Sequence, residues 1–198
     1  MDTKNLATVR QMFAQAVFTH KVQEVAAEFK EQRARQYKWI DVAIAGCILI
    51  LLALQAAHLD MPIFAYIGIG VTVGEIIFKI VQGVFDVDKQ AMLHKNSALK
   101  FMALRDKYLL LITDIMSEKI THHDVVLQRN ALQQEYQSIC DLAPLTGSRE
   151  YSEAQKRLIG RAVKGEEFTW SDAEIDRFLT SELRLGQIGD HLPKATLQ

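Results

Sequence analysis

The chain has 198 residues, a formal net charge of −1 and a mean hydropathy close to zero. This near-neutral charge argues against a nucleic-acid-binding protein, and the presence of only 3 prolines argues against a β-rich domain. The mean hydropathy conceals an uneven distribution, because two strongly apolar runs are averaged with a charged remainder.

Residues 5–38 are predicted to form a long amphipathic helix on the cytosolic side. No signal peptide is expected, since residues 1–38 carry charges throughout and lack an apolar core. The basic and aromatic end of this helix, residues 30–39, could lie on anionic lipid headgroups, although packing against other cytosolic helices is favoured. The apolar positions that share a helical spacing are Leu6, Val9, Phe13 and Val17, followed with a shifted phase by Val22, Val25 and Phe29.

Two apolar runs, at about 39–58 and 62–84, are each long enough to cross a bilayer as a helix. A buried hairpin in a soluble bundle is the alternative. It is disfavoured because an amphipathic helix shows polar positions on every turn, whereas residues 42–54 show none. The short link at 58–61 suits a tight hairpin, and the first run is expected to act as the targeting signal.

Basic residues lie before the first span and after the second span, but not in the link between them. Lys30, Arg33, Arg35 and Lys38 precede the first span, Lys89, Lys95 and Lys100 follow the second, and the link contains neither lysine nor arginine. The positive-inside rule then predicts that both termini lie in the cytoplasm and the link outside, with Tyr37 and Trp39 at the headgroup level.

The second span carries a stripe of polar residues at spacings of 3, 4, 3 and 4, which places them on one face of a helix. Glu75 lies near mid-membrane, where a charge is costly and usually faces water or a bundle interior. Two interpretations remain open: an ion pair between Glu75 and Lys79 that joins the hairpin, or a pore lining shared by several copies. The stripe consists of Thr72, Glu75, Lys79, Gln82 and Asp86.

Other positions in the two spans are less informative. Gly70 and Gly74 form a GxxxG pattern that would let another helix approach closely. In the first span, Asp41 and Gln55 are fourteen residues apart and fall on nearly the same helix face. Cys47 lies within this span and is expected to stay reduced.

The remainder is predicted to be a cytosolic helical bundle. A continuous helix is expected from Phe85 to Met116, then a helix from the capping box at Thr121–Asp124 to about Leu142. Shorter helices are expected at 148–163 and at 171–185. The apolar residues Phe101, Leu104, Tyr108, Leu111 and Ile115 are predicted to form a bundle or oligomer core.

The predicted fold is an all-α membrane protein, a transmembrane hairpin whose long helices extend into a cytosolic bundle. Its parts are an amphipathic helix (1–38), the hairpin (39–84), the bundle (85–142) and short helices with a tail (143–198). No spacing of Ser, His, Asp or Cys indicates catalysis, and no enzyme activity, cofactor or metal site is expected.

This layout resembles that of the SLATT domains, two-transmembrane effector domains associated with bacterial nucleotidyltransferase and SLOG sensor proteins. The resemblance covers nearly the whole chain: the basic lead-in, the two spans with a very short link, the long helix at 85–115 and the later helical pieces at 127–158.

The resemblance implies an effector of bacterial anti-phage defence, a homo-oligomer that perforates the inner membrane in abortive infection. Its sensor partner would be a nucleotidyltransferase or a reverse transcriptase system. No nucleotide-binding domain is fused to this sequence, so sensing would fall to the cytosolic helices or to that partner. The alternative function is a membrane-anchored scaffold whose hairpin only tethers the bundle.

Overall fold

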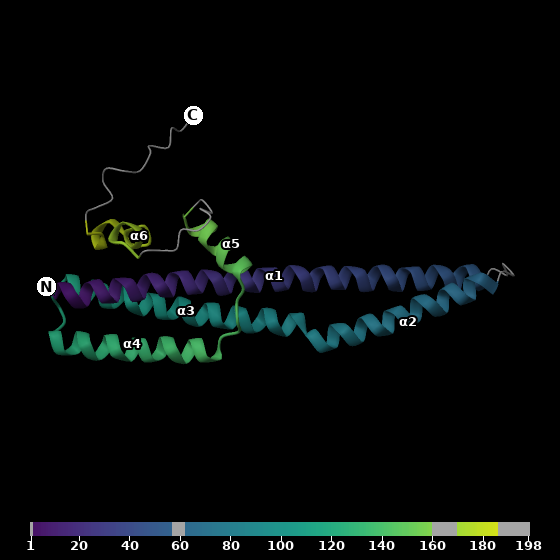
Figure 1. Cartoon of the computed structure of the whole chain (residues 1–198), viewed down its shortest axis with the longest axis horizontal. Helices are drawn as coiled ribbons and strands as arrows, with labels where there is room; N and C mark the ends of the chain where they lie inside the picture. Colours follow the sequence, from purple (N-terminus) through teal and green to yellow (C-terminus); the bar gives the residue numbers. More distant parts are fainter. Residues whose placement is uncertain (1, 57–61, 160–169, 186–198) are drawn as a thin grey trace, which may run out of the picture. The chain divides into compact units, whose positions relative to one another are not determined.

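The computed structural model describes residues 2–56, 62–159 and 170–185, and within them the fold is entirely helical (Figure 1). This confirms the predicted all-α class. The link at 58–61, the end of the first span and residues 160–163 of an expected helix lie outside the described residues. The helices are α1 (Thr3–Ala56), α2 (Pro62–Phe85), α3 (Val87–Met116), α4 (His122–Leu142), α5 (Ser148–Ile159), α6 (Asp172–Asp176) and the 3₁₀ helix η1 (Ser181–Leu183).

Helix α1 runs without a break from the amphipathic lead-in through the first apolar run. Different patterns predict a helix on each side of Trp39, and neither proline nor glycine interrupts residues 3–45. The two predicted elements therefore form one helix of 54 residues.

Helices α2 and α3 are separated by one non-helical residue, Asp86, whose φ is 31°. The sequence predicted an unbroken helix here, because aspartate interrupts an apolar pattern only weakly. Aspartate tolerates the left-handed region better than most residues. Its Oδ1 accepts a hydrogen bond from the Lys89 N–H at 3.1 Å and caps α3, while the Gln90 amide donates to the Phe85 carbonyl at 2.7 Å. The break thus leaves both helix ends hydrogen-bonded.

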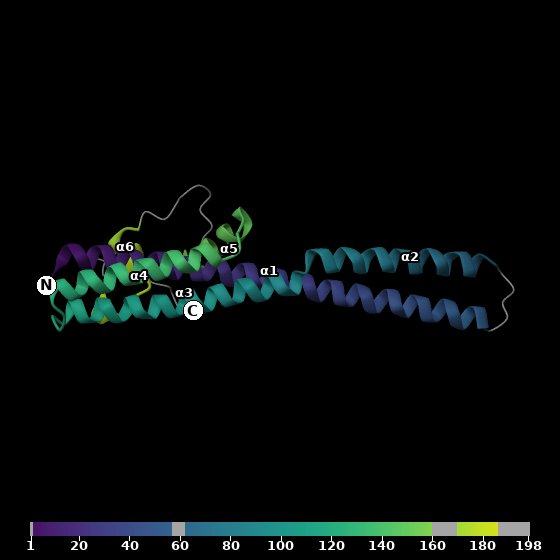
Figure 2. The same ribbon diagram turned by 90° about the horizontal axis from the view of Figure 1, so that it is seen from below.

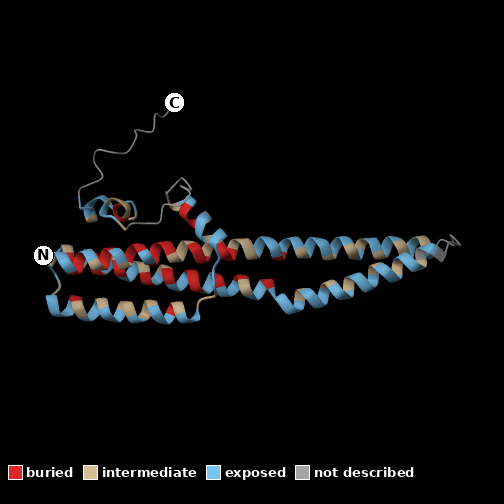
Figure 3. Cartoon of the chain, in the orientation of Figure 1, coloured by how far each residue is buried: buried red, intermediate tan, exposed pale blue. Residues whose placement is uncertain are grey.

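The chain divides into two compact units. The helical unit contains residues up to Val25 and from His94 onward, and the hairpin unit is Ala26–Leu93. In the helical unit, α3 lies antiparallel to the first part of α1, and α4 lies beside α3 in both views (Figures 1 and 2). Most buried residues belong to this unit (Figure 3).

The core of the helical unit contains all the residues predicted for a bundle core. Phe101, Leu104, Tyr108, Leu111 and Ile115 of α3 are at most 3% exposed and pack with Leu6, Val9, Phe13 and Val17 of α1. They are buried within a single chain, so an interface with another copy would have to use different residues.

Tyr108 places a polar hydroxyl group in this buried core. Among the described residues its hydroxyl oxygen has no hydrogen-bond partner, and burial raises the pKa of Tyr108 to about 12. The phenol therefore acts mainly as an apolar ring in the core.

The helices after α3 agree only in part with those predicted from the sequence. Thr121 caps α4 as predicted: its hydroxyl accepts from the Asp124 N–H at 3.3 Å and donates to the Asp124 carboxylate at 2.6 Å. A capping box also forms between Ser171 and Glu174, but α6 ends at Asp176 instead of continuing to residue 185. The prediction of a long helix there was wrong, because the chain turns after α6. This turn brings the Leu183 carbonyl to Arg10 and the Leu185 N–H to Asp176.

Candidate functional site in the membrane hairpin

Two helical stretches of the described residues are long and apolar enough to cross a membrane, one in α1 and one beginning in α2. Their most apolar windows are 0% buried within the chain. A core helix of a soluble protein would bury such a window. Large apolar side chains such as Leu49, Ile76 and Ile80 are more than half exposed instead, which is the condition expected of residues that face lipid.

The polar stripe contains a close ion pair. Lys79 Nζ lies 2.8 Å from Glu75 Oε1, one helical turn away on α2. The Glu75 side chain is 18% exposed and the Lys79 side chain 59% exposed. The carboxylate is thus the more enclosed partner, while the long lysine stem can carry its ammonium group towards water.

Three members of the stripe line a polar cleft of about 370 Å³ at the α2–α3 break. Lys79, Gln82 and Asp86 contribute to it from α2 and the break. Across the cleft, the Gln82 amide donates to Asp41 Oδ2 of α1 at 3.3 Å and so links the two spans. The cleft is lined by Ala34, Tyr37, Lys38, Asp41, Lys79, Gln82, Gly83, Asp86, Val87 and Asp88.

Asp41 has a larger part in this cleft than its sequence position suggested. We expected it to be hydrated at the end of the first span. Its Oδ1 is buried and has no hydrogen-bond partner among the described residues. Nearby, Lys38 Nζ lies 3.2 Å from Asp88 Oδ1, at the end of the hairpin unit that contains the α2–α3 break.

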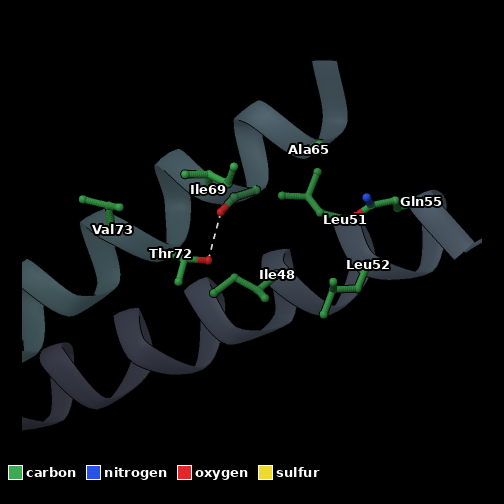
Figure 4. A pocket seen from close by; sticks show the side chains of 9 residues that line it. Ile48, Leu51, Leu52, Gln55, Ala65, Ile69, Thr72 and Val73 are labelled. Atoms are coloured by element: carbon green, nitrogen blue, oxygen red, sulfur yellow. Dashed lines mark hydrogen bonds between the residues drawn. The ribbon is translucent and has the colours of Figure 1, made fainter. Parts of the chain in front are cut away.

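Thr72 lies apart from the other stripe residues, in an apolar groove of about 400 Å³ between α1 and α2 (Figure 4). Its hydroxyl donates to the Gly68 carbonyl on its own helix at 2.9 Å. Gln55 of α1 lines the same groove, so Asp41 and Gln55 do both lie on the side of α1 that faces α2. The remaining lining residues are Ile48, Leu51, Leu52, Ala65, Gly68, Ile69 and Val73.

The glycines of α2 are not packed against α1. A Cβ atom added at Gly70 or Gly74 would meet no other atom within 4 Å, and the same holds for Gly68. The GxxxG face is therefore open in the single chain, and close helix packing through it would need a helix from another molecule.

A second polar site, in the helical unit, was missed by the sequence analysis. Arg10 of α1 is fully buried and forms an ion pair with the fully buried Asp176 of α6. The sequence does contain a signal for this site. Arg10 lies beside Leu6, Val9 and Phe13, on the buried face of the helix, and a charge on a buried face requires a buried partner.

Taken together, the two exposed apolar spans and the helical unit define a two-span membrane protein. Residues 6–174 match the SMODS and SLOG-associating 2TM effector domain family 4. The chain belongs to this family, whose members are two-transmembrane effector domains of bacterial anti-phage systems. Comparison with curated proteins and with solved structures gave no significant match.

Proposed function

We propose that the protein is a regulated membrane effector of abortive infection, which assembles into a homo-oligomer and opens a pore in the bacterial inner membrane. The Glu75–Lys79 pair carries this proposal. A helix that serves only as an anchor gains nothing from two charges within its span, because each is costly to insert.

The open glycine face supports assembly. A single hairpin cannot enclose a water-filled path, so several copies must surround it. Gly70 and Gly74 leave α2 free for close approach by a neighbouring helix. Copies packed in this way could then bring their polar stripes together around a common axis, where rings of like residues set the local potential.

The alternative function is a membrane-anchored scaffold, and one set of contacts favours it. Glu75 is paired with Lys79, and Gln82 is bonded to Asp41 within the same hairpin. Contacts of this kind satisfy polar groups locally and can serve only to hold two spans together. A tether of this type would recruit partners through the helical unit and leave membrane permeability unchanged.

Measuring the membrane potential of cells that over-produce the protein distinguishes a pore from a membrane-anchored scaffold. Thr72→Leu is the cleanest stripe variant, because the Thr72 hydroxyl donates to a carbonyl of its own helix, so its removal breaks no described hydrogen bond between the two spans. We expect wild type to depolarise the membrane and Thr72→Leu to reduce this several-fold by narrowing and drying the path. The matched control is Ile76→Leu, on the exposed face of α2. An unchanged membrane potential with well-expressed wild type would favour the tether.

We further propose that both termini lie in the cytoplasm of the inner membrane. The basic flanks and the absence of lysine and arginine from the link support this orientation. Trp39, which is 74% exposed at the start of the span, is placed as an interfacial anchor. In a Cys47→Ser, Cys140→Ser background, Leu59→Cys should react with an impermeant thiol reagent added outside intact spheroplasts. Ser152→Cys should react only after lysis, and the opposite pattern would reverse the proposed topology.

The trigger is proposed to come from a separate sensor, either a nucleotidyltransferase that makes a nucleotide signal or a reverse transcriptase system. The family description supports association with SMODS and SLOG proteins in general. We propose no enzymatic activity and no direct binding of nucleic acid for this chain.

A further inference from the structure

The C-terminal segment, defined here as Trp170–Leu185, packs on the first part of α1. Ile175 and Leu179 are 1% and 3% exposed and belong to the same core as Leu6, Val9 and Phe13. The Trp170 ring lies edge-on to Phe18 with centroids 6.1 Å apart. The segment thus covers an apolar surface of the helical unit.

A buried charge fixes the register of this packing. Arg10 pairs with Asp176 and also donates from Nη1 to the Leu183 carbonyl at 2.9 Å. The Asp176 carboxylate in turn accepts from the Leu185 N–H at 3.2 Å. Arg10 therefore holds both ends of the turn that follows α6.

The physical chemistry of this contact makes it reversible. Helix α6 has only five residues, and so short a helix is not stable apart from its packing surface. The Coulombic gain of a buried ion pair is largely offset by the cost of dehydrating both charges. Arg10 Nε also has no hydrogen-bond partner among the described residues, which adds a further cost to the docked state.

Arg10 stands on the same uninterrupted helix as the first membrane span. We propose that the C-terminal segment is an autoinhibitory latch: while docked on Arg10 it holds the effector inactive, and its release permits pore opening. This inference rests on the proposed pore function and names the element that regulates it.

The test uses Asp176→Asn in the full-length protein. This variant keeps an acceptor for the Leu185 N–H but removes the buried counter-charge of Arg10, which strongly disfavours docking. In detergent, trypsin cleavage after Arg177 and Arg184, both exposed residues of the segment, should rise at least about tenfold, since cleavage follows the undocked population. In cells, depolarisation should begin at lower expression than for wild type.

Two further variants make the result specific. Arg10→Met with Asp176→Asn removes both charges together and should return cleavage and depolarisation to near wild-type values, because no unpaired charge remains. Asp172→Asn is the matched control: Asp172 lies 3.6 Å from Arg10 but is 46% exposed, so its removal should change neither readout. Helix content measured by circular dichroism verifies that each variant is folded.

The outcomes distinguish the two proposals. If Asp176→Asn increases cleavage but depolarises no more than wild type, the latch is rejected while the pore stands. Unchanged cleavage in Asp176→Asn also rejects the latch, because the ion pair then does not hold the segment. If neither wild type nor any variant depolarises the membrane, the pore and its latch are both rejected. If Asp176→Asn loses its helix content, the double variant decides: depolarisation well above wild type in that variant rejects the latch.

Discussion

Leu104→Glu combined with Leu111→Glu is expected to unfold the helical unit. Both leucines are almost fully buried in its core. Truncating one buried leucine costs about 2–5 kcal/mol, and a buried carboxylate without a partner adds several more. The sum for two sites is comparable with the whole stability of a domain, about 5–15 kcal/mol. Circular dichroism in detergent should show a large loss of helix and no cooperative thermal transition.

Leu110→Glu is the control for this experiment, because Leu110 lies beside Leu111 in sequence but is 66% exposed. It should leave helix content intact. Native mass spectrometry of wild type is expected to show a homo-oligomer. Only monomer at every protein concentration, with or without the partner, would argue against assembly. A well-folded double variant would show that the core is not organised as described.

Removing one partner of the Glu75–Lys79 pair should impair membrane insertion more than removing both. A lone charge at the centre of a span costs about 2.5–3.5 kcal/mol on insertion scales. The structure adds an asymmetry, since Glu75 is the more enclosed side chain. Lys79→Gln, which strands Glu75, should therefore lower the inserted fraction more than Glu75→Gln, whose remaining lysine can extend towards the headgroups. Alkaline extraction of membranes measures that fraction.

The double variant Glu75→Gln with Lys79→Gln then reports on the pore. It should insert nearly as wild type, because no unpaired charge is left in the span. If the stripe lines a lumen, the ion preference or size of the conductance should change, as it does when rings of charge are removed. Ile77→Leu, on the exposed face, should have little effect. The pore hypothesis would be falsified if every stripe variant left depolarisation unchanged at equal expression.

The spans and the bundle core could be predicted because each depends on a periodic pattern. Residues 42–54 contain no polar side chain, and the α3 core residues recur every three or four positions. Patterns of this kind report which face of a helix avoids water without any knowledge of its partner. The class of fold followed from them directly.

Features that depend on one contact between distant residues could not be predicted in the same way. The buried pair of Arg10 and Asp176 joins residues 166 positions apart, and no sequence pattern around either residue identifies its partner. The break at Asp86 is accompanied by two local hydrogen bonds, which an apolar pattern does not report. In the hairpin, the contact between Gln82 and Asp41 required knowing how the two spans are rotated towards each other.

The separation between Arg10 and Asp176 also has a consequence for biosynthesis. At about 5–20 residues per second, a ribosome needs roughly 8–33 s to add the 166 residues between them. Both apolar spans precede Asp176 by more than ninety positions and reach the membrane while Arg10 still lacks its counter-ion. A nascent chain released before residue 170 would therefore contain the entire hairpin and none of the segment that docks on α1. Interrupted translation would yield membrane-inserted copies that the intramolecular ion pair cannot restrain.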